Sequence, residues 1–176
     1  MPRHVMSAIL LASALAGCGG GEEADREPAP AGAAARPSGK GACGLLMQAE
    51  VDAIFGASVG AGASETLEGG KELCSWPAGE DPALLLQVEP ALASATAAVD
   101  LGEGYRVVEI EAMSGPAALS VETGGEGTVA VLALNASGKT VTLSPIGLGV
   151  QDGSDRLERL KELMELVAER AGATSG

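Results

Sequence analysis

Neighbouring carboxylates are the residues of this sequence that could carry out acid–base chemistry. Two carboxyl groups that face each other across a cleft can hydrolyse a glycosidic bond. Three pairs lie close together in the sequence: Glu80 with Asp81, Glu109 with Glu111, and Asp152 with Asp155. Sugar sites usually add aromatic platforms, whereas this chain has one Phe, one Trp and one Tyr. We therefore expect solvated turn residues at these positions, with a carboxylate-based hydrolase as the alternative function.

Two further segments have some features of ligand-binding loops. Asp152-Gly153-Ser154-Asp155 offers oxygen ligands for calcium, but the rest of a calcium-binding loop is missing. Residues 147–153, GLGVQDG, are glycine-rich, yet their spacing departs from the G-x-G-x-x-G pattern of dinucleotide-binding loops. The sequence therefore predicts neither a cofactor nor a metal site.

The N-terminus has the layout of a secretory signal peptide. Arg3 precedes an uncharged apolar run, residues 5–16, which is too short to cross a bilayer core that requires about 20 residues. Leu15-Ala16-Gly17-Cys18 then resembles the lipobox of bacterial lipoproteins. That resemblance implies cleavage before Cys18, diacylglycerol on its sulfur and often an acyl group on its amino nitrogen. The alternative is an ordinary signal peptide with an incidental cysteine.

Removal of residues 1–17 would also remove the one histidine of the chain, His4. A mature protein without histidine has no Ser-His-Asp or Cys-His site and no histidine-ligated zinc or iron. The nucleophilic and metal-dependent enzymes built on those groups are therefore excluded for the mature chain.

A flexible tether is expected after the lipidated cysteine. Residues 19–42 contain no Leu, Ile, Val, Met or aromatic residue, so they cannot bury enough apolar surface to offset the entropy of ordering. The chain has 24 acidic and 11 basic residues, a formal net charge of −13. Such an acidic surface repels nucleic acid, and we expect no nucleic-acid partner. The expected partner is the lipid bilayer, reached through acylated Cys18.

Cys43 and Cys74 are the remaining cysteines. Export implies an oxidising compartment, where two such cysteines most simply form a disulfide. A structural metal site would want four nitrogen or sulfur ligands, and a redox pair usually has the spacing C-x-x-C. Both alternatives fit these two residues less well than a disulfide.

Residues 43–171 are expected to form one domain, followed by a tail at 172–176. Met47, Val51, Ile54 and Phe55 lie on one face of a helix that Gly56 would end. A short Ala-rich helix is expected at 90–99, and strands at 71–77, 83–88, 105–110, 117–122, 128–135 and 139–146. This order predicts an α+β fold, in which an antiparallel β-sheet carries an N-terminal helix and a C-terminal amphipathic helix packed on one face.

The C-terminal helix is the clearest element of the sequence. DRLERLKELMELVAERAG, beginning at Asp155, places its apolar residues on one face, with Asp155 and Glu158 as an expected capping box and Gly172 as the expected end. Acidic and basic side chains balance on its polar face, whereas helices that lie on a membrane surface are usually basic there. We therefore expect this helix to pack on the sheet.

Residues 43–56, CGLLMQAEVDAIFG, followed by Cys74-Ser75-Trp76, resemble a family of uncharacterised bacterial envelope lipoproteins. The pattern of that family is Cys-Leu-Leu-Thr-x-x-Glu-Val, a glycine that ends the helix, and a downstream Cys-x-Trp. Met47 stands where threonine is expected, so the capping hydroxyl is lost and the helix start should be weaker. The resemblance implies a disulfide-pinned helix beside a sheet and implies no enzymatic activity.

Two classes of function remain. We expect a non-catalytic module, held at the outer face of the plasma membrane or at the outer membrane, that binds an envelope protein or a small ligand. An exposed apolar patch near Trp76 would be a suitable binding surface. The carboxylate-based hydrolase is the alternative, and it would require two facing carboxylates with at least one raised pKa.

Overall fold

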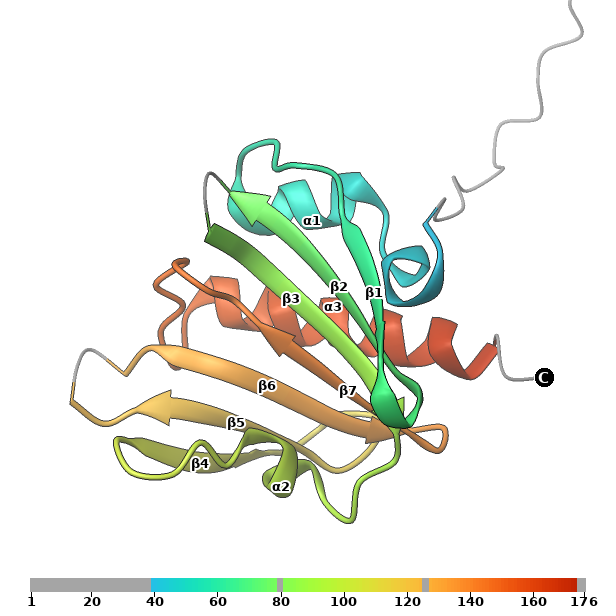
Figure 1. Ribbon diagram of the computed structural model, residues 1–176. Helices are drawn as coiled ribbons and strands as arrows, with labels where there is room; N and C mark the ends of the chain where they lie inside the picture. Colours follow the sequence, from blue (N-terminus) through green and yellow to red (C-terminus); the bar gives the residue numbers. More distant parts are fainter. Residues whose placement is uncertain (1–38, 79–80, 125–126, 174–176) are drawn as a thin grey trace, which may run out of the picture. The chain divides into compact units, whose positions relative to one another are not determined.

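The described residues of the structure, a computed structural model, are 39–78, 81–124 and 127–173, and all lie in the second of the two units of the chain, Ala35–Gly176 (Figure 1). The strands are β1 (Ala63–Leu67), β2 (Lys71–Ala78), β3 (Asp81–Pro90), β4 (Tyr105–Ile110), β5 (Ala117–Glu122), β6 (Val129–Ala136) and β7 (Lys139–Ser144). The helices are α1 (Gln48–Phe55), α2 (Ala95–Val99) and α3 (Asp155–Ala173), with short 3₁₀ turns η1 (Gly41–Leu45) and η2 (Glu68–Gly70).

The strands of the described residues form one antiparallel sheet in the order β1-β2-β3-β7-β6-β5-β4. The chain crosses from the centre of the sheet at β3 to its edge at β4, and this connection carries α2. Strands β4 to β7 then return as a meander that places β7 beside β3. The predicted α+β fold with an antiparallel sheet is confirmed.

The main core lies between the sheet and the helices α3 and α1, which run behind the strands in Figure 1. Alternate residues of the central strands point toward α3, because side chains along a strand alternate between faces. Leu86, Leu134 and Leu143 on the sheet and Leu160 and Met164 on α3 are all fully buried in this layer. The C-terminal helix therefore packs on the sheet, as its apolar stripe predicts.

Helix α2 covers the opposite face of the sheet, which the sequence analysis did not anticipate. Ala95 and Val99 of α2 pack against Ala118 of β5 and Ala133 of β6, forming a second, smaller core. Alanines on both sides let this short helix approach the strands closely. The other face therefore carries its own helix instead of being left bare.

The disulfide between Cys43 of η1 and Cys74 of β2 is present, as predicted. Both cysteines are buried, and Cys74 lies beside Trp76 in the same strand layer. Trp76 is 2% exposed, so the indole itself forms no part of an exposed apolar patch. Gly62 lies so close to Trp76 and Cys74 that an added Cβ would be 2.7 Å from the indole Nε1. The indole is thus part of the core around the disulfide.

Several predicted boundaries differ in the structure. Helix α3 does not end at Gly172 but continues to Ala173; Gly172 lies where an added Cβ would be 2.7 Å from the Oγ of Ser137. The cap of α3 is Ser154, whose Oγ accepts from the Leu157 N–H at 3.2 Å, so the expected capping box at Asp155 is wrong. At the N-terminal end, η1 begins before Cys43 and buries Ala42.

Candidate functional site

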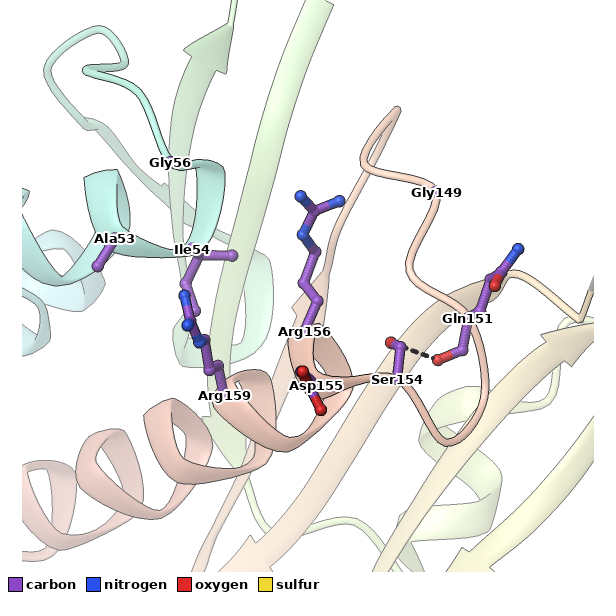
Figure 2. Close-up of a pocket in the computed structure, with 9 residues that line it drawn as sticks. All are labelled: Ala53, Ile54, Gly56, Gly149, Gln151, Ser154, Asp155, Arg156 and Arg159. Carbon is purple, nitrogen blue, oxygen red and sulfur yellow. Dashed lines mark hydrogen bonds between the residues drawn. The ribbon is translucent and has the colours of Figure 1, made fainter.

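An open surface pocket of about 390 Å³ lies between the end of α1 and the beginning of α3, and most of the residues that line it, including both of its arginines, are exposed (Figure 2). Its walls come from Ile54 and Gly56 of the α1 end, from the segment around Gly149, and from Arg156 and Arg159 of α3. We call it the arginine cavity. Two stretches of the chain about a hundred residues apart, 53–56 and 149–159, meet there, so the tertiary fold builds the site.

Local turns set the two helix ends that form the cavity. Gly56 adopts a left-handed conformation with φ of 68°, and its N–H donates to the Asp52 carbonyl at 2.9 Å, which ends α1. At the other side, the Ser154 hydroxyl donates to the Gln151 carbonyl at 2.7 Å, drawn as a dashed line in Figure 2. Because Ser154 also caps α3, the start of that helix is fixed beside the loop.

The two arginines are the distinctive side chains of the cavity. Arg156 donates from Nη1 to the Leu148 carbonyl at 2.7 Å, and Figure 2 shows it between α1 and the segment that carries Gly149. Within the described part of the chain, Arg106 and Arg170 have carboxylate partners, Asp152 and Glu50, each at 2.8 Å. Neither Arg156 nor Arg159 forms an ion pair there. Of the arginines in the described ranges, the two that lack a carboxylate partner therefore line the same cavity.

An apolar groove continues from the cavity along the seam between α1 and α3. It has a volume of about 330 Å³ and shares Ala53, Ile54 and Arg159 with the arginine cavity, while Leu163 and Leu166 form its apolar floor. We call it the α1–α3 groove. Together the two hollows present two guanidinium groups at one end and, in the groove, apolar side chains beside the carboxylates of Glu50 and Glu162.

Glu50 and Arg170 join the two helices beside this groove. The Arg170 guanidinium donates to both Glu50 carboxylate oxygens at 2.8 Å and also to the Leu45 carbonyl at 2.7 Å. Burial alone would raise the pKa of Glu50, but hydrogen bonds from Arg170 and from the Met47 N–H, with the Arg170 charge, lower it overall. The same pairing raises the pKa of Arg170. The pair thus stays ionised and holds the groove walls together.

Two of the three carboxylate pairs considered from the sequence, Glu109 with Glu111 and Asp152 with Asp155, lie within the described residues. Asp152 is bound by Arg106 at 2.8 Å, whereas Asp155 lines the arginine cavity. Glu109 and Glu111 are exposed on or next to the edge strand β4. Glu80 lies outside the described residues. Across the described ranges, no cluster of three or more His, Cys, Asp or Glu side chains is arranged to hold a metal ion.

One buried carboxylate was missed by the sequence analysis. Glu89 is 4% exposed and contacts the Lys71 Nζ at 2.9 Å and the Gln87 amide nitrogen at 2.8 Å. Its only sequence signal is its position two residues after Gln87, on the same face of β3. The ion pair and the amide satisfy both carboxylate oxygens, which is a structural arrangement.

The predicted lipidation site, Cys18, lies outside the described residues. Comparison with known proteins finds no matching family model, no matching curated protein and no matching solved structure. In the described part of the chain, no helix has the length and apolar character needed to cross a bilayer. The function must therefore be inferred from the residues and their geometry.

Proposed function

We propose that this protein is a lipid-anchored, non-catalytic binding module of the bacterial cell envelope. Residues 1–17 act as the signal peptide, Cys18 carries the lipid, and the following Gly-, Ala- and Pro-rich segment is a tether. The folded domain works outside the cytoplasm, where it binds a small ligand or a segment of an envelope protein.

The Cys43–Cys74 disulfide is the observation that carries the proposal. Disulfides persist in exported proteins and are rare in the reducing cytosol. The bridge joins the first turn of the domain to β2, close to the end of the expected tether. The covalent bond at this point fixes the first turn of the domain, which begins immediately after the expected lipidated tail, to the sheet.

The arginine cavity supports binding rather than catalysis. It offers two guanidinium groups and an apolar extension, and the Ser154 hydroxyl that lines it is occupied in capping α3. A hydrolase would need a nucleophile beside a base or a carboxyl group with a raised pKa. Among the residues that the structure describes, hydrogen bonds lower the pKa values of the Glu50 and Asp52 carboxyl groups instead.

Membrane fractionation of the Cys18→Ala variant tests the anchor. We expect the wild-type chain in the membrane fraction and Cys18→Ala in the soluble envelope fraction. The matched control is the double variant Cys43→Ala/Cys74→Ala, which loses two cysteines but keeps Cys18. It should remain with the membrane even though its domain is less stable. A Cys18→Ala chain that has lost residues 1–17, shown by its mass, and still stays with the membrane in both salt and alkaline washes contradicts the proposal.

A further inference from the structure

We infer that the arginine cavity binds the head group of an anionic amphiphile whose apolar chain lies in the α1–α3 groove. The inference rests on the proposed binding function and names the chemical class of its ligand: a monoanionic carboxylate or phosphodiester joined to an apolar chain. Arg156 and Arg159 hold the head group, while Ala53, Ile54, Leu163 and Leu166 line the chain.

The distribution of charge supports an anionic head group. In a chain of net charge −13, carboxylates are abundant, yet neither arginine of the cavity is paired with one among the described residues. Arg156 lies in the first turn of α3, where the helix dipole disfavours a positive charge. One of its N–H groups holds the Leu148 carbonyl, and within the described ranges its remaining N–H donors, with those of Arg159, are free to bind an anion that would compensate both guanidinium groups.

The charge count of the cavity favours a monoanion. Its charged lining residues are Arg156, Arg159 and Asp155, which together carry one net positive charge. A guanidinium group binds carboxylate and phosphate oxygens with two parallel hydrogen bonds, so two arginines can hold one such head group by its oxygens. A carboxylate or a phosphodiester would neutralise the site.

The groove supports an apolar chain attached to that head group. Ile54 and Ala53 line both hollows, so the apolar surface begins where the arginines are. Leu163 and Leu166 extend it along α3, and Glu50 beside it is neutralised by Arg170. Glu162 also lines the groove, and its charge limits how far an apolar chain can follow α3. A bare inorganic anion would use only the arginine end.

Photolabelling tests the inference with the full-length chain in its native membranes. The probe is a dodecanoate that carries a diazirine in its chain, and labelled positions are read by peptide mass spectrometry. We expect label on α1 near Ile54 and on α3 near Leu163. The uncharged dodecanol counterpart should label these peptides about tenfold less, because it loses the charge-assisted hydrogen bonds.

Arg159→Gln is the deciding variant, since the Arg159 side chain makes no hydrogen bond or ion pair among the described residues that the substitution would break. We expect it to lower labelling about tenfold, whereas Arg106→Gln, an exposed arginine on β4 outside the cavity, should label like the wild type. Arg156→Gln should also lower labelling but releases the Leu148 carbonyl, so retention of the disulfide and of the melting temperature is checked for every variant.

A second probe, phosphatidylglycerol with a diazirine in one acyl chain, distinguishes the sources of the head group. Labelling by dodecanoate alone identifies a free fatty carboxylate, and labelling by both probes identifies a membrane lipid. Equal labelling by dodecanol and dodecanoate, or no label on α1 and α3, overturns the inference. If the site labels while Cys18 carries no lipid, the anchor of the proposed function fails and the ligand site stands.

Discussion

Arg170, near the end of α3, donates two hydrogen bonds of 2.8 Å to the carboxylate of Glu50 in the first turn of α1. The two residues are 120 positions apart in the chain, so this contact ties the start of the domain to its C-terminal helix. The Glu50 carboxylate also accepts from the Met47 N–H at 2.7 Å, which caps α1 without a capping hydroxyl. A single carboxylate thus begins one helix and anchors another.

Replacing this carboxylate should destabilise the domain. We expect Glu50→Gln to lower the free energy of unfolding by about 1–3 kcal/mol, because Arg170 loses a charged partner in a partly buried position. Urea unfolding near neutral pH measures the change. The matched control is Glu158→Gln, whose carboxylate is 61% exposed and pairs with Lys161; it should cost about 0.5 kcal/mol or less.

The same pair predicts how stability depends on pH. The folded pKa of Glu50 lies below its ordinary value of 4.5, so the unfolded chain binds more protons in the interval between the two. Its stabilising contribution is complete above pH 4.5 and is lost as the pH falls through the folded pKa. The stability difference between wild type and Glu50→Gln should therefore shrink on acidification. A difference that grows on acidification contradicts this assignment.

Removing the disulfide should weaken the whole domain. Because it links residues separated by 31 positions, the double variant Cys43→Ala/Cys74→Ala should lose about 3–4 kcal/mol of unfolding free energy. Denaturant unfolding of the oxidised wild type, the reduced wild type and the double variant measures this. The reduced wild type and the double variant should both be less stable than the oxidised protein. Equal stability of oxidised and reduced wild type would show that the bridge contributes nothing.

Gly62 should tolerate no side chain. An alanine Cβ there would lie 2.7 Å from the Trp76 Nε1 and 2.8 Å from the Cys74 Sγ, and both of those residues are held in the core. We expect Gly62→Ala to lower the unfolding free energy by about 1–3 kcal/mol. Gly124→Ala is the control, since no atom lies within 4 Å of an added Cβ there. Comparable melting temperatures for the two variants would contradict the close packing.

Two buried hydroxyls should respond in opposite ways. Ser120, on the α2 face of β5, has a buried Oγ without a hydrogen-bond partner among the described residues. We expect Ser120→Ala to be neutral or to stabilise by about 1 kcal/mol.

The Thr140 hydroxyl accepts from the Leu92 N–H at 2.8 Å and donates to Asn135 at 2.7 Å. Thr140→Val should therefore cost about 1–3 kcal/mol in the same unfolding assay.

Local patterns predicted most of the strands and both long helices. The strands predicted at 105–110 and 117–122 have the same bounds as β4 and β5 in the structure, because alternation and turn residues are local signals. Strand β1 was not predicted, since Ala63–Leu67 is mainly polar and exposed. Its strand conformation comes from pairing with β2, for which the residues of β1 alone give no signal.

The candidate site could not be predicted from the same patterns. On the sequence, Arg156 and Arg159 belong to a helix face with balanced charges, and nothing local separates them from Arg170. The fold pairs Arg170 with Glu50 across the domain and leaves the other two arginines beside the α1 end. Such pairing depends on the tertiary fold. The burial of Trp76 depends on the tertiary fold in the same way.

The mass of the N-terminal peptide of the protein isolated from membranes tests the central proposal most directly. We expect a peptide that begins at Cys18 and carries a diacylglycerol thioether on its sulfur, with or without an acyl group on its amino nitrogen. An unmodified Cys18, or a chain that retains residues 1–17 in the cytoplasm, would contradict the lipid anchor.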